Sequence, residues 1–207
     1  MEQKAAAAYG KYRGIRDAAW QCLLDCGVKD LPVQASLVAA QLGVGLFAYG
    51  PNREILRQSR LEALLEAMGF AYADPSGRLM VFYNDETSLQ QIRFTVAHEL
   101  GHILLGHVGP STPRGRLLEP SVQKLERAAD SFAIRLLAPS CALWAKNACT
   151  AEEISALCDI PLDAAGKRAR RMRELRERNV WLKSDLEREL YHQLGLPDRE
   201  EPDEPAL

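Results

Sequence analysis

The sequence predicts an α+β protein that is mostly helical, with a small mixed or antiparallel β-sheet ahead of a central helix and a helical appendage near the C-terminus. Apolar residues recur at helical spacing through most of the chain. Two short apolar runs flank a turn signal at residues 74–77, and a capping-box sequence opens the C-terminal part. With 207 residues and 47% apolar content, the chain is long enough for one full core.

Composition excludes several classes of protein. The net charge of −2 does not favour a polyanionic partner. Residues 1–10 contain an alanine run without the long apolar core of a signal peptide, and no apolar run approaches a membrane span. The five cysteines are irregularly spaced without a C-x-x-C pair, which is typical of reduced thiols. We therefore expect a cytoplasmic protein with no membrane contact.

The first third of the chain contains three predicted helices and one strand. Residues 11–26 have amphipathic helical spacing. Residues 31–42 form a second predicted helix, with a proline at its first position and a glycine after its end. Residues 44–49 are a candidate strand. Pro51-Asn52 is then expected to break the chain before a third helix over residues 54–68.

A hairpin and a helix are predicted next. Residues 70–72 and 79–83 flank the Asp74-Pro75-Ser76-Gly77 turn signal, which indicates two antiparallel strands. The following helix is expected to begin after an N-cap at Thr87 or Ser88, because hydroxyl side chains satisfy free backbone N–H groups there.

That helix carries His98-Glu99-Leu100-Gly101-His102, an H-E-x-x-H pattern. Two histidines four residues apart lie only about 40° apart around a helix, so both rings can reach one Zn²⁺. Glu99 projects beside them and is the predicted catalytic general base of a hydrolase. The alternative is a chance match on a packed helix, and a catalytic zinc would need a third protein ligand.

Glu126 is the best candidate for the third ligand. On a helix one face would carry Glu126, Asp130, Ala133 and Leu137. A second, polar face that suits water would carry Arg127, Ser131 and Arg135. An inward carboxylate needs a cation or hydrogen bonds. Glu126 is therefore a predicted zinc ligand, and Asp130 is predicted to orient a ligand imidazole. The alternative is a surface helix with solvated acids.

Together, H-E-L-G-H-I-L-L-G-H and E-x-x-A-D-x-F-A-x-x-L-L-A-P resemble the ImmA/IrrE family of zinc metallopeptidases, over roughly residues 31–179. The resemblance implies a zincin-like fold in which His98, His102 and Glu126 bind zinc and Glu99 is the base. It also implies a narrow-specificity endopeptidase. The substrate would be a helix-turn-helix repressor or antitoxin-like regulator, often encoded beside the peptidase in mobile elements, whose cleavage derepresses genes.

Three further segments near the motif have predicted roles around the site. His107 lies one residue short of the third-ligand position of H-E-x-x-H-x-x-G-x-x-H enzymes, so we expect it to cap or pack at the helix end. Residues 79–84 are the candidate sheet edge that would hold an extended substrate, although an interior strand has the same pattern. Residues 108–120 form a predicted loop that could border the cleft.

The C-terminal part has the outline of a helix-turn-helix. Thr150 and Glu153 form a capping box, and a turn at residues 159–161 precedes a helix from Leu162. Its basic residues are Lys167, Arg168, Arg170, Arg171, Arg173, Arg176 and Arg178. They could contact DNA phosphates, but we favour a solvated helix packed on the core. A last helix is predicted over residues 181–194, before an acidic, disordered tail from residue 197.

These predictions divide the chain into four parts. They are an N-terminal helix (1–30), a zincin-like metallopeptidase domain (31–148), a helix-turn-helix-like segment (149–195) and an acidic tail (196–207). The predicted function is zinc-dependent cleavage of a regulator protein, with direct DNA binding less favoured. Two alternatives are a DNA-binding regulator whose metal site is structural or sensory, and a toxin–antitoxin component that acts by binding alone.

Overall fold

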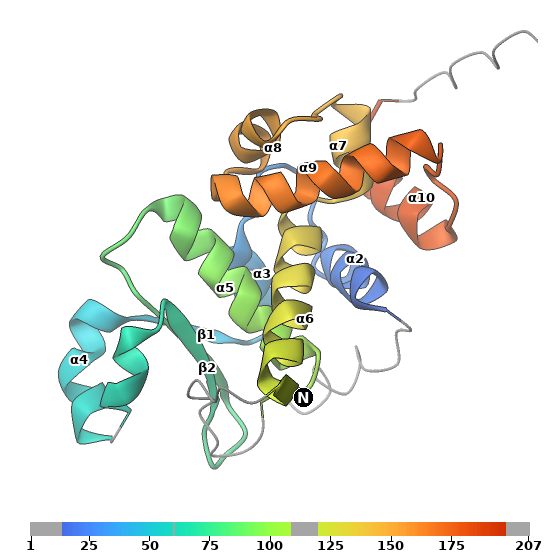
Figure 1. Ribbon diagram of the computed structural model, residues 1–207. Helices are drawn as coiled ribbons and strands as arrows, with labels where there is room; N and C mark the ends of the chain where they lie inside the picture. The colour runs from blue at the N-terminus through green and yellow to red at the C-terminus, as the bar shows by residue number, and fades with distance from the viewer. Residues whose placement is uncertain (1–13, 60, 109–119, 198–207) are drawn as a thin grey trace, which may run out of the picture.

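The computed structural model describes residues 14–59, 61–108 and 120–197, and these form a mostly helical α+β protein (Figure 1). Helices α5 and α6 lie side by side at the centre, the sheet and α4 lie on one side, and α7 to α10 cover one end. The elements are α2 (Ile15–Asp25), α3 (Ala35–Gln41), β1 (Gly45–Ala48), α4 (Tyr49–Gln58), the 3-10 helix η1 (Glu62–Glu66), β2 (Gly69–Ala73), β3 (Leu79–Tyr83), α5 (Leu89–Leu104), α6 (Pro120–Leu137), α7 (Ser140–Ala145), α8 (Ala151–Cys158), α9 (Leu162–Glu177) and α10 (Asp185–Gln193).

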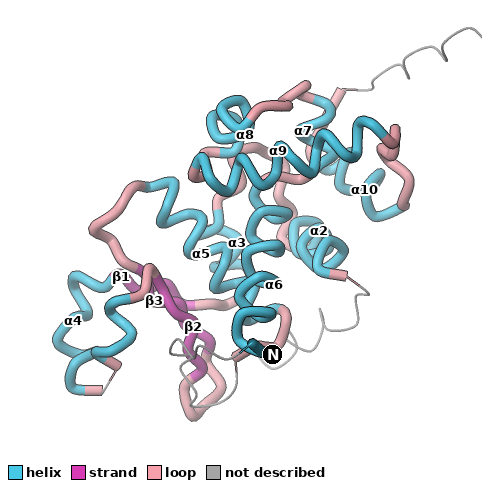
Figure 2. Tube along the Cα trace, viewed as in Figure 1, coloured by secondary structure: helices cyan, strands magenta, loops and turns pink. Residues whose placement is uncertain are grey.

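The sheet is small and mixed, as expected, with strand order β1-β3-β2 (Figure 2). Strand β3 pairs in parallel with β1 and antiparallel with β2. The predicted hairpin is confirmed: Oδ1 of Asp74 accepts hydrogen bonds from the backbone N–H groups of Ser76 and Arg78, and Gly77 has φ +89°. Because β3 is central, the prediction that residues 79–84 form a sheet edge is wrong. Among the described strands, β1 and β2 are the edges.

Two predicted helix limits are also wrong. Helix α4 begins at Tyr49, directly after β1, and contains Pro51-Asn52, where we expected a break. Proline is tolerated there because N–H groups in the first turn have no acceptor within the helix. The chain then passes through η1, so residues 54–68 are not one helix. Helix α3 begins at Ala35 rather than near residue 31, because its N-cap Gln34 has an extended backbone and Val33 before it is buried.

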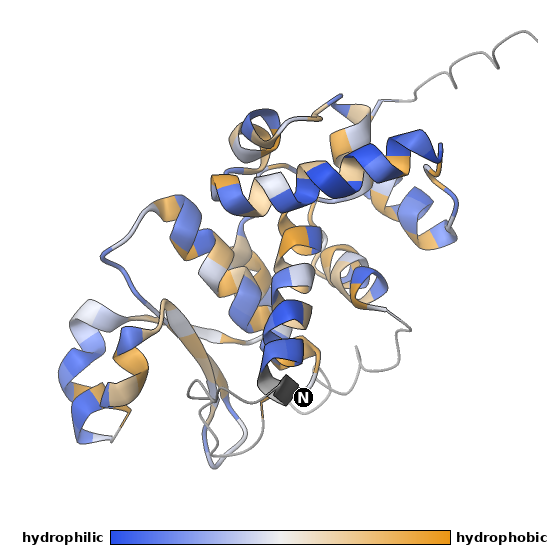
Figure 3. Cartoon of the chain, in the orientation of Figure 1, coloured by the Kyte–Doolittle hydropathy of each residue, from blue (hydrophilic) through white to orange (hydrophobic). Residues whose placement is uncertain are grey.

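A continuous hydrophobic core extends from Ala18 to Leu194 and includes side chains from α2, α3 and α5 to α10. A smaller cluster of Tyr49, Leu56 and Phe70 lies between α4 and the sheet. Figure 3 shows that the visible face of α9 is largely hydrophilic. No helix in the described part of the chain is long and apolar enough to cross a membrane.

Helices α5 and α6 make their closest approach at Gly101. A Cβ atom placed there would lie 3.1 Å from Cδ1 of Phe132 and 3.2 Å from both Cα and O of Ala129. Ordinary contacts of this kind are 3.4–4 Å. A side chain at this position of the H-E-x-x-H motif would therefore force α6 to move by a few tenths of an ångström, so glycine permits the close packing of the two helices here.

The C-terminal helices pack on this centre. The capping box is confirmed, since Thr150 Oγ1 accepts from the N–H of Glu153 and the Glu153 carboxylate accepts from the N–H of Thr150. Arg93 of α5 donates to the carbonyl and carboxylate of Asp159, in the turn between α8 and α9. The last helix is shorter than predicted: Trp181 precedes α10, and its ring stacks 5.7 Å from that of Trp144.

Three predictions fall partly outside the described residues. They concern the start of the 11–26 helix, most of the 108–120 loop and the acidic tail from residue 198 onward.

Candidate metal centre

Helix α5 begins at Ser88, the second of the two predicted N-caps, whose Oγ accepts from the N–H of Gln91 at 3.2 Å. The helix runs without interruption through the H-E-x-x-H motif, so His98 and His102 share a face. Both His102 and Glu99 are buried. The packing of α5 on its neighbours therefore fixes these side chains before any ligand binds.

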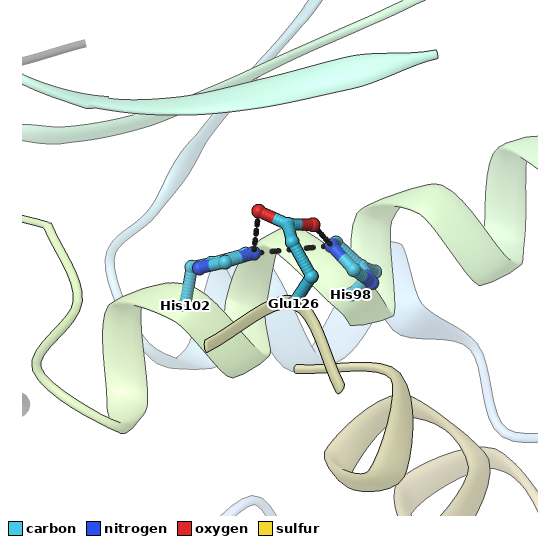
Figure 4. Close-up of side chains that lie close together, drawn as sticks. All are labelled: His98, His102 and Glu126. Atoms are coloured by element: carbon cyan, nitrogen blue, oxygen red, sulfur yellow. Dashed lines mark hydrogen bonds and ion pairs between the residues drawn. The ribbon is translucent and has the colours of Figure 1, made fainter. Parts of the chain in front are cut away.

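The side chains of His98, His102 and Glu126 converge between α5 and α6 (Figure 4). The Nε2 atoms of the two histidines are 3.1 Å apart. Glu126 Oε2 lies 3.2 Å from His98 Nε2, and its Oε1 lies 3.4 Å from His102 Nε2. Within the described residues, these three are the group of histidine, cysteine and carboxylate side chains close enough to share a metal ion.

The group is close enough to share one metal ion. Ligands at the usual Zn–N and Zn–O lengths of about 2.0–2.2 Å are about 3.3–3.6 Å apart when arranged tetrahedrally. The two Nε2 atoms are 3.1 Å apart, and each lies close to a different oxygen of Glu126, at 3.2 and 3.4 Å, so one ligand atom from each residue can reach a common ion after small side-chain shifts. Two imidazoles and one carboxylate also leave the fourth position open, as in catalytic zinc sites.

Asp130 lies where it was predicted, against His98. Its Oδ1 atom is 3.0 Å from His98 Nδ1, which leaves Nε2 facing Glu126 and His102. Its other oxygen is 3.5 Å from Nζ of Lys167. Such a contact selects one imidazole tautomer and holds the ring in place. Because Asp130 contacts both His98 of α5 and Lys167 of α9, it links the candidate metal site to α9.

The metal-free site holds an excess proton. Burial lowers the pKa of His98, but hydrogen bonds to Asp130 and Glu126 outweigh it and raise that pKa to about 10. Hydrogen bonds from His102 and His98 hold the pKa of Glu126 well below its ordinary value. A cation placed among the three groups would take over the stabilising role of the proton on His98.

His107 contacts the site from outside, which the sequence did not predict. Its Nδ1 atom is 3.1 Å from Nδ1 of His102, and its N–H donates to the His102 carbonyl at 2.8 Å. Gly106, at φ +74°, ends the helix and folds the chain back to make this contact. His107 lies outside the three-residue group, as expected, but it supports the ring of His102. Only its position directly after a helix-ending glycine could have suggested this.

Glu99 faces strand β2. Its side chain is buried, with 8% of the residue exposed, and it accepts a hydrogen bond from the backbone N–H of Ala71. Burial raises the pKa of Glu99, and the neighbouring histidine rings act in the opposite direction. A Cβ at Gly69 would lie 2.4 Å from Thr95 Cγ2 and 3.6 Å from Glu99 Cγ, so β2 passes directly against α5.

The free edge of β2 is turned toward this site. In the β2–β3 ladder, Asn84 N–H donates to the Met68 carbonyl and Asp74 N–H donates to the Arg78 carbonyl. Backbone groups alternate along an antiparallel strand, so Gly69, Ala71 and Ala73 direct theirs away from β3. The Ala71–Glu99 bond agrees with this assignment. The edge beside the site is therefore β2, not the predicted 79–84.

Arg168 is not placed to contact DNA. Only 3% of it is exposed, and its Nε–H donates to the Ala138 carbonyl at 2.7 Å. The buried face of α9 also includes Ala164, Ala165, Ala169 and Met172. This part of the basic helix packs on the core, which agrees with the favoured interpretation of α9 as a solvated helix packed on the core rather than a DNA-binding helix.

Comparison with family models matches most of the region described above. The family model of peptidase M78, described as the IrrE N-terminal-like domain, matches residues 60–170, more than half of the chain. The matched region contains β2, β3, α5 and α6, and so includes every residue of the candidate site. No curated protein and no solved structure matches the chain.

Proposed function

We propose that the chain, which belongs to the IrrE N-terminal-like family of M78 metallopeptidases, is a zinc-dependent endopeptidase whose site is formed by α5, α6 and the edge of β2. The observation that carries the proposal is the convergence of His98, His102 and Glu126, whose ligand atoms lie close enough together to hold one metal ion. These three side chains would hold the zinc. When bound, zinc acts as a Lewis acid that polarises the scissile carbonyl and acidifies water.

Glu99 is the proposed general base. It lies one residue after the first ligand and is held by the Ala71 N–H, so its carboxylate has little freedom to rotate away. In its ionised form it would take the proton of the attacking water and pass it to the leaving amine. Burial opposes ionisation, while the cationic surroundings favour it. The pKa of Glu99 lies above its ordinary value, so the ionised carboxylate would be a stronger base than an exposed glutamate.

The substrate would bind in an extended form along β2. Backbone groups of Gly69 and Ala73 and the carbonyl of Ala71 are directed to the edge away from β3, and a peptide strand can pair with such groups, while the Ala71 N–H is already used by Glu99. The small residues at these positions leave the edge accessible to a second backbone. Since β2 also contacts Glu99, a peptide paired there would pass close to the base.

The substrate class is proposed from the family. We infer that the target is a helix-turn-helix repressor or antitoxin-like regulator, whose cleavage would derepress genes. A segment of such a regulator that can become extended would meet the requirement of strand addition at β2.

The test is a Glu99→Gln variant, which keeps the size of the side chain and removes its basicity. The zinc-loaded variant and wild type would be incubated with the regulator encoded nearest the gene, and cleavage followed by mass spectrometry. We expect zinc binding and the melting temperature to be retained and cleavage to fall by about 10²–10⁴-fold. Glu152→Gln, at an exposed position of α8, is the matched control.

Unchanged cleavage by Glu99→Gln would exclude its role as base. If the variant lost cleavage but retained all regulatory activity in cells, the DNA-binding or binding-only alternatives would be favoured instead.

A further inference from the structure

A pocket lies between α6 and α9, beside the metal centre, with a volume of about 360 Å³. It is formed where α9 crosses α6 near the C-terminal end of α6 (Figure 1). Its charged lining residues are Arg127, Asp130, Arg135, Lys167, Arg168 and Arg171. Five of these six are cationic, so the pocket carries a strong positive charge in a chain whose net charge is −2.

Most of this charge is not neutralised within the described residues. Lys167 pairs with Asp130 at 3.5 Å and with Asp163 at 4.0 Å, and Arg171 pairs with Glu174. In the described part of the chain, the other three cations of the lining have no carboxylate within ion-pair distance. Those three are Arg127, Arg135 and Arg168.

Arg168 is buried with an unsatisfied donor. Its Nε–H donates to Ala138, but its Nη2 atom is buried and has no hydrogen-bond partner in the described residues. Glu187 interacts with it electrostatically from beyond ion-pair distance. Burying the Arg168 guanidinium costs free energy, and an anion in the pocket that Arg168 lines would offset the cost of its charge through space, since Nη2 itself is not exposed.

Arg135 adds a second cation to the same wall. Its guanidinium donates to the carbonyl and hydroxyl of Ser131, one turn earlier on α6. Burial lowers the pKa of Arg135, and the positive charges of Arg171 and Arg16 lower it further. Like charges have therefore been brought together from α2, α6 and α9, an arrangement that an anion would stabilise.

We propose that this pocket binds a small phosphorylated anion, either inorganic phosphate or the phosphate group of a mononucleotide-sized ligand. Phosphate presents several oxygens that match the paired donors of arginine, and bidentate arginine–phosphate contacts are strong. The volume is near the lower end of the range of about 300–1,000 Å³ for small-molecule sites.

A small anion fits better than a nucleic acid backbone. In the pocket lining, Arg168 is buried and Arg135 is half-buried, so neither side chain is fully exposed. Acidic residues also interrupt the surroundings, since Asp163 and Glu174 of α9 are exposed and adjacent to Lys167 and Arg171. A polyanion needs a continuous track of exposed cations, whereas one phosphate needs only a recessed group of them.

The test measures binding of inorganic phosphate and of adenosine monophosphate by calorimetry, with the full chain at constant ionic strength. Because phosphate also binds zinc, the titrations are made on chelator-treated and on zinc-loaded protein. The pocket variant is Arg127→Gln with Arg171→Gln, at exposed lining positions. The control is Arg170→Gln with Arg173→Gln, which removes the same charge from positions outside the lining.

We expect saturable binding without zinc, weakened about ten- to a hundredfold or more in the pocket variant and unchanged in the control. Tighter binding of the nucleotide than of phosphate would identify an organic phosphate as the ligand, and equal binding would identify phosphate itself. Thermal denaturation of both variants checks that they are folded.

Three results would overturn the proposal. They are binding only when zinc is present, equal weakening in the pocket and control variants, and binding of a short oligonucleotide without binding of phosphate or mononucleotide. The first would assign the anion to the metal, and the other two would show a diffuse basic surface. None of them bears on whether Glu99→Gln abolishes cleavage, so this proposal and the peptidase proposal fail separately.

Discussion

The contact between α5 and α6 at Gly101 gives the sharpest prediction. In Gly101→Ala the new methyl group would lie 3.1–3.2 Å from Phe132 and from the backbone of Ala129. Backbone atoms cannot rotate away, so α6 must shift by a few tenths of an ångström. Overpacking of this kind costs about 1–3 kcal/mol, whereas replacing glycine by alanine in a helix stabilises by about 0.5–1 kcal/mol. We expect a net loss of stability of about 1–2 kcal/mol.

The same shift should weaken metal binding. Glu126 is three residues before Ala129, so moving α6 away moves the carboxylate from the histidines. Zinc–ligand distances are tolerated only within about 0.2 Å, and we expect the zinc affinity to fall by about tenfold or more. Stability would be measured by urea denaturation of the chelator-treated chain, and affinity by competition with a chromophoric chelator.

Gly166→Ala is the matched control. Gly166 lies inside α9, and a Cβ there would have nothing within 4 Å. This substitution should therefore stabilise the chain by about 0.5–1 kcal/mol and leave zinc affinity unchanged. If Gly101→Ala were as stable as Gly166→Ala and bound zinc as tightly as wild type, the helix contact would not be what positions Glu126.

Further predictions follow from the same geometry. Asp130→Asn should weaken zinc binding by about 10–100-fold, measured by chelator competition, whereas Asp163→Asn, which also removes a partner of Lys167, should not. The pKa of His98 is raised above that of the unfolded chain, so protonated His98 stabilises the metal-free chain fully below about pH 6.5, and this stabilisation is lost as the pH rises toward about 10. Zinc must displace that proton, so its affinity should increase with pH between about 6 and 8, with proton release measurable by calorimetry in different buffers; a pH-independent affinity would contradict this. Thr150→Ala should destabilise the chain by about 1 kcal/mol in urea denaturation, because it removes the cap of α8; no change would show that the cap is dispensable.

Local rules predicted the motif helix, the hairpin and the capping box. The spacing of His98 and His102 is a property of any helix, and Ser88 caps the helix by contact with a residue three positions away. The sidedness of α6 predicted that Glu126 and Asp130 point toward the histidines. Each of these predictions depended on contacts or spacing within a single element, and such local features can be read directly from the sequence.

The packing of elements that are far apart in the sequence could not be predicted from local patterns. Whether residues 79–84 form an edge depends on β1, which is separated from β3 by α4, η1 and β2 and yet pairs with it in parallel. The pattern of apolar and polar residues in β3 does not indicate that β1 pairs with it. The polar face of α6 shows the same limit: Arg127 is exposed, as expected of a face that suits water, but the position of α9, which makes Arg127, Ser131 and Arg135 line a pocket, could not be predicted from α6 alone.

In the proposed peptidase, metal binding and substrate binding depend on different elements. All three candidate ligands come from α5 and α6, whose spacing is set by Gly101, whereas the open peptide edge comes from β2. Glu99 is the residue that belongs to both, because it lies on α5 and is bonded to Ala71 of β2. Under this proposal, changes at the edge would alter which peptide is cleaved without loss of zinc, while a change that separates α5 from α6 would remove both activities together. Measuring zinc affinity and peptide cleavage in both kinds of variant would show whether the α5–α6 pair or strand β2 determines each activity.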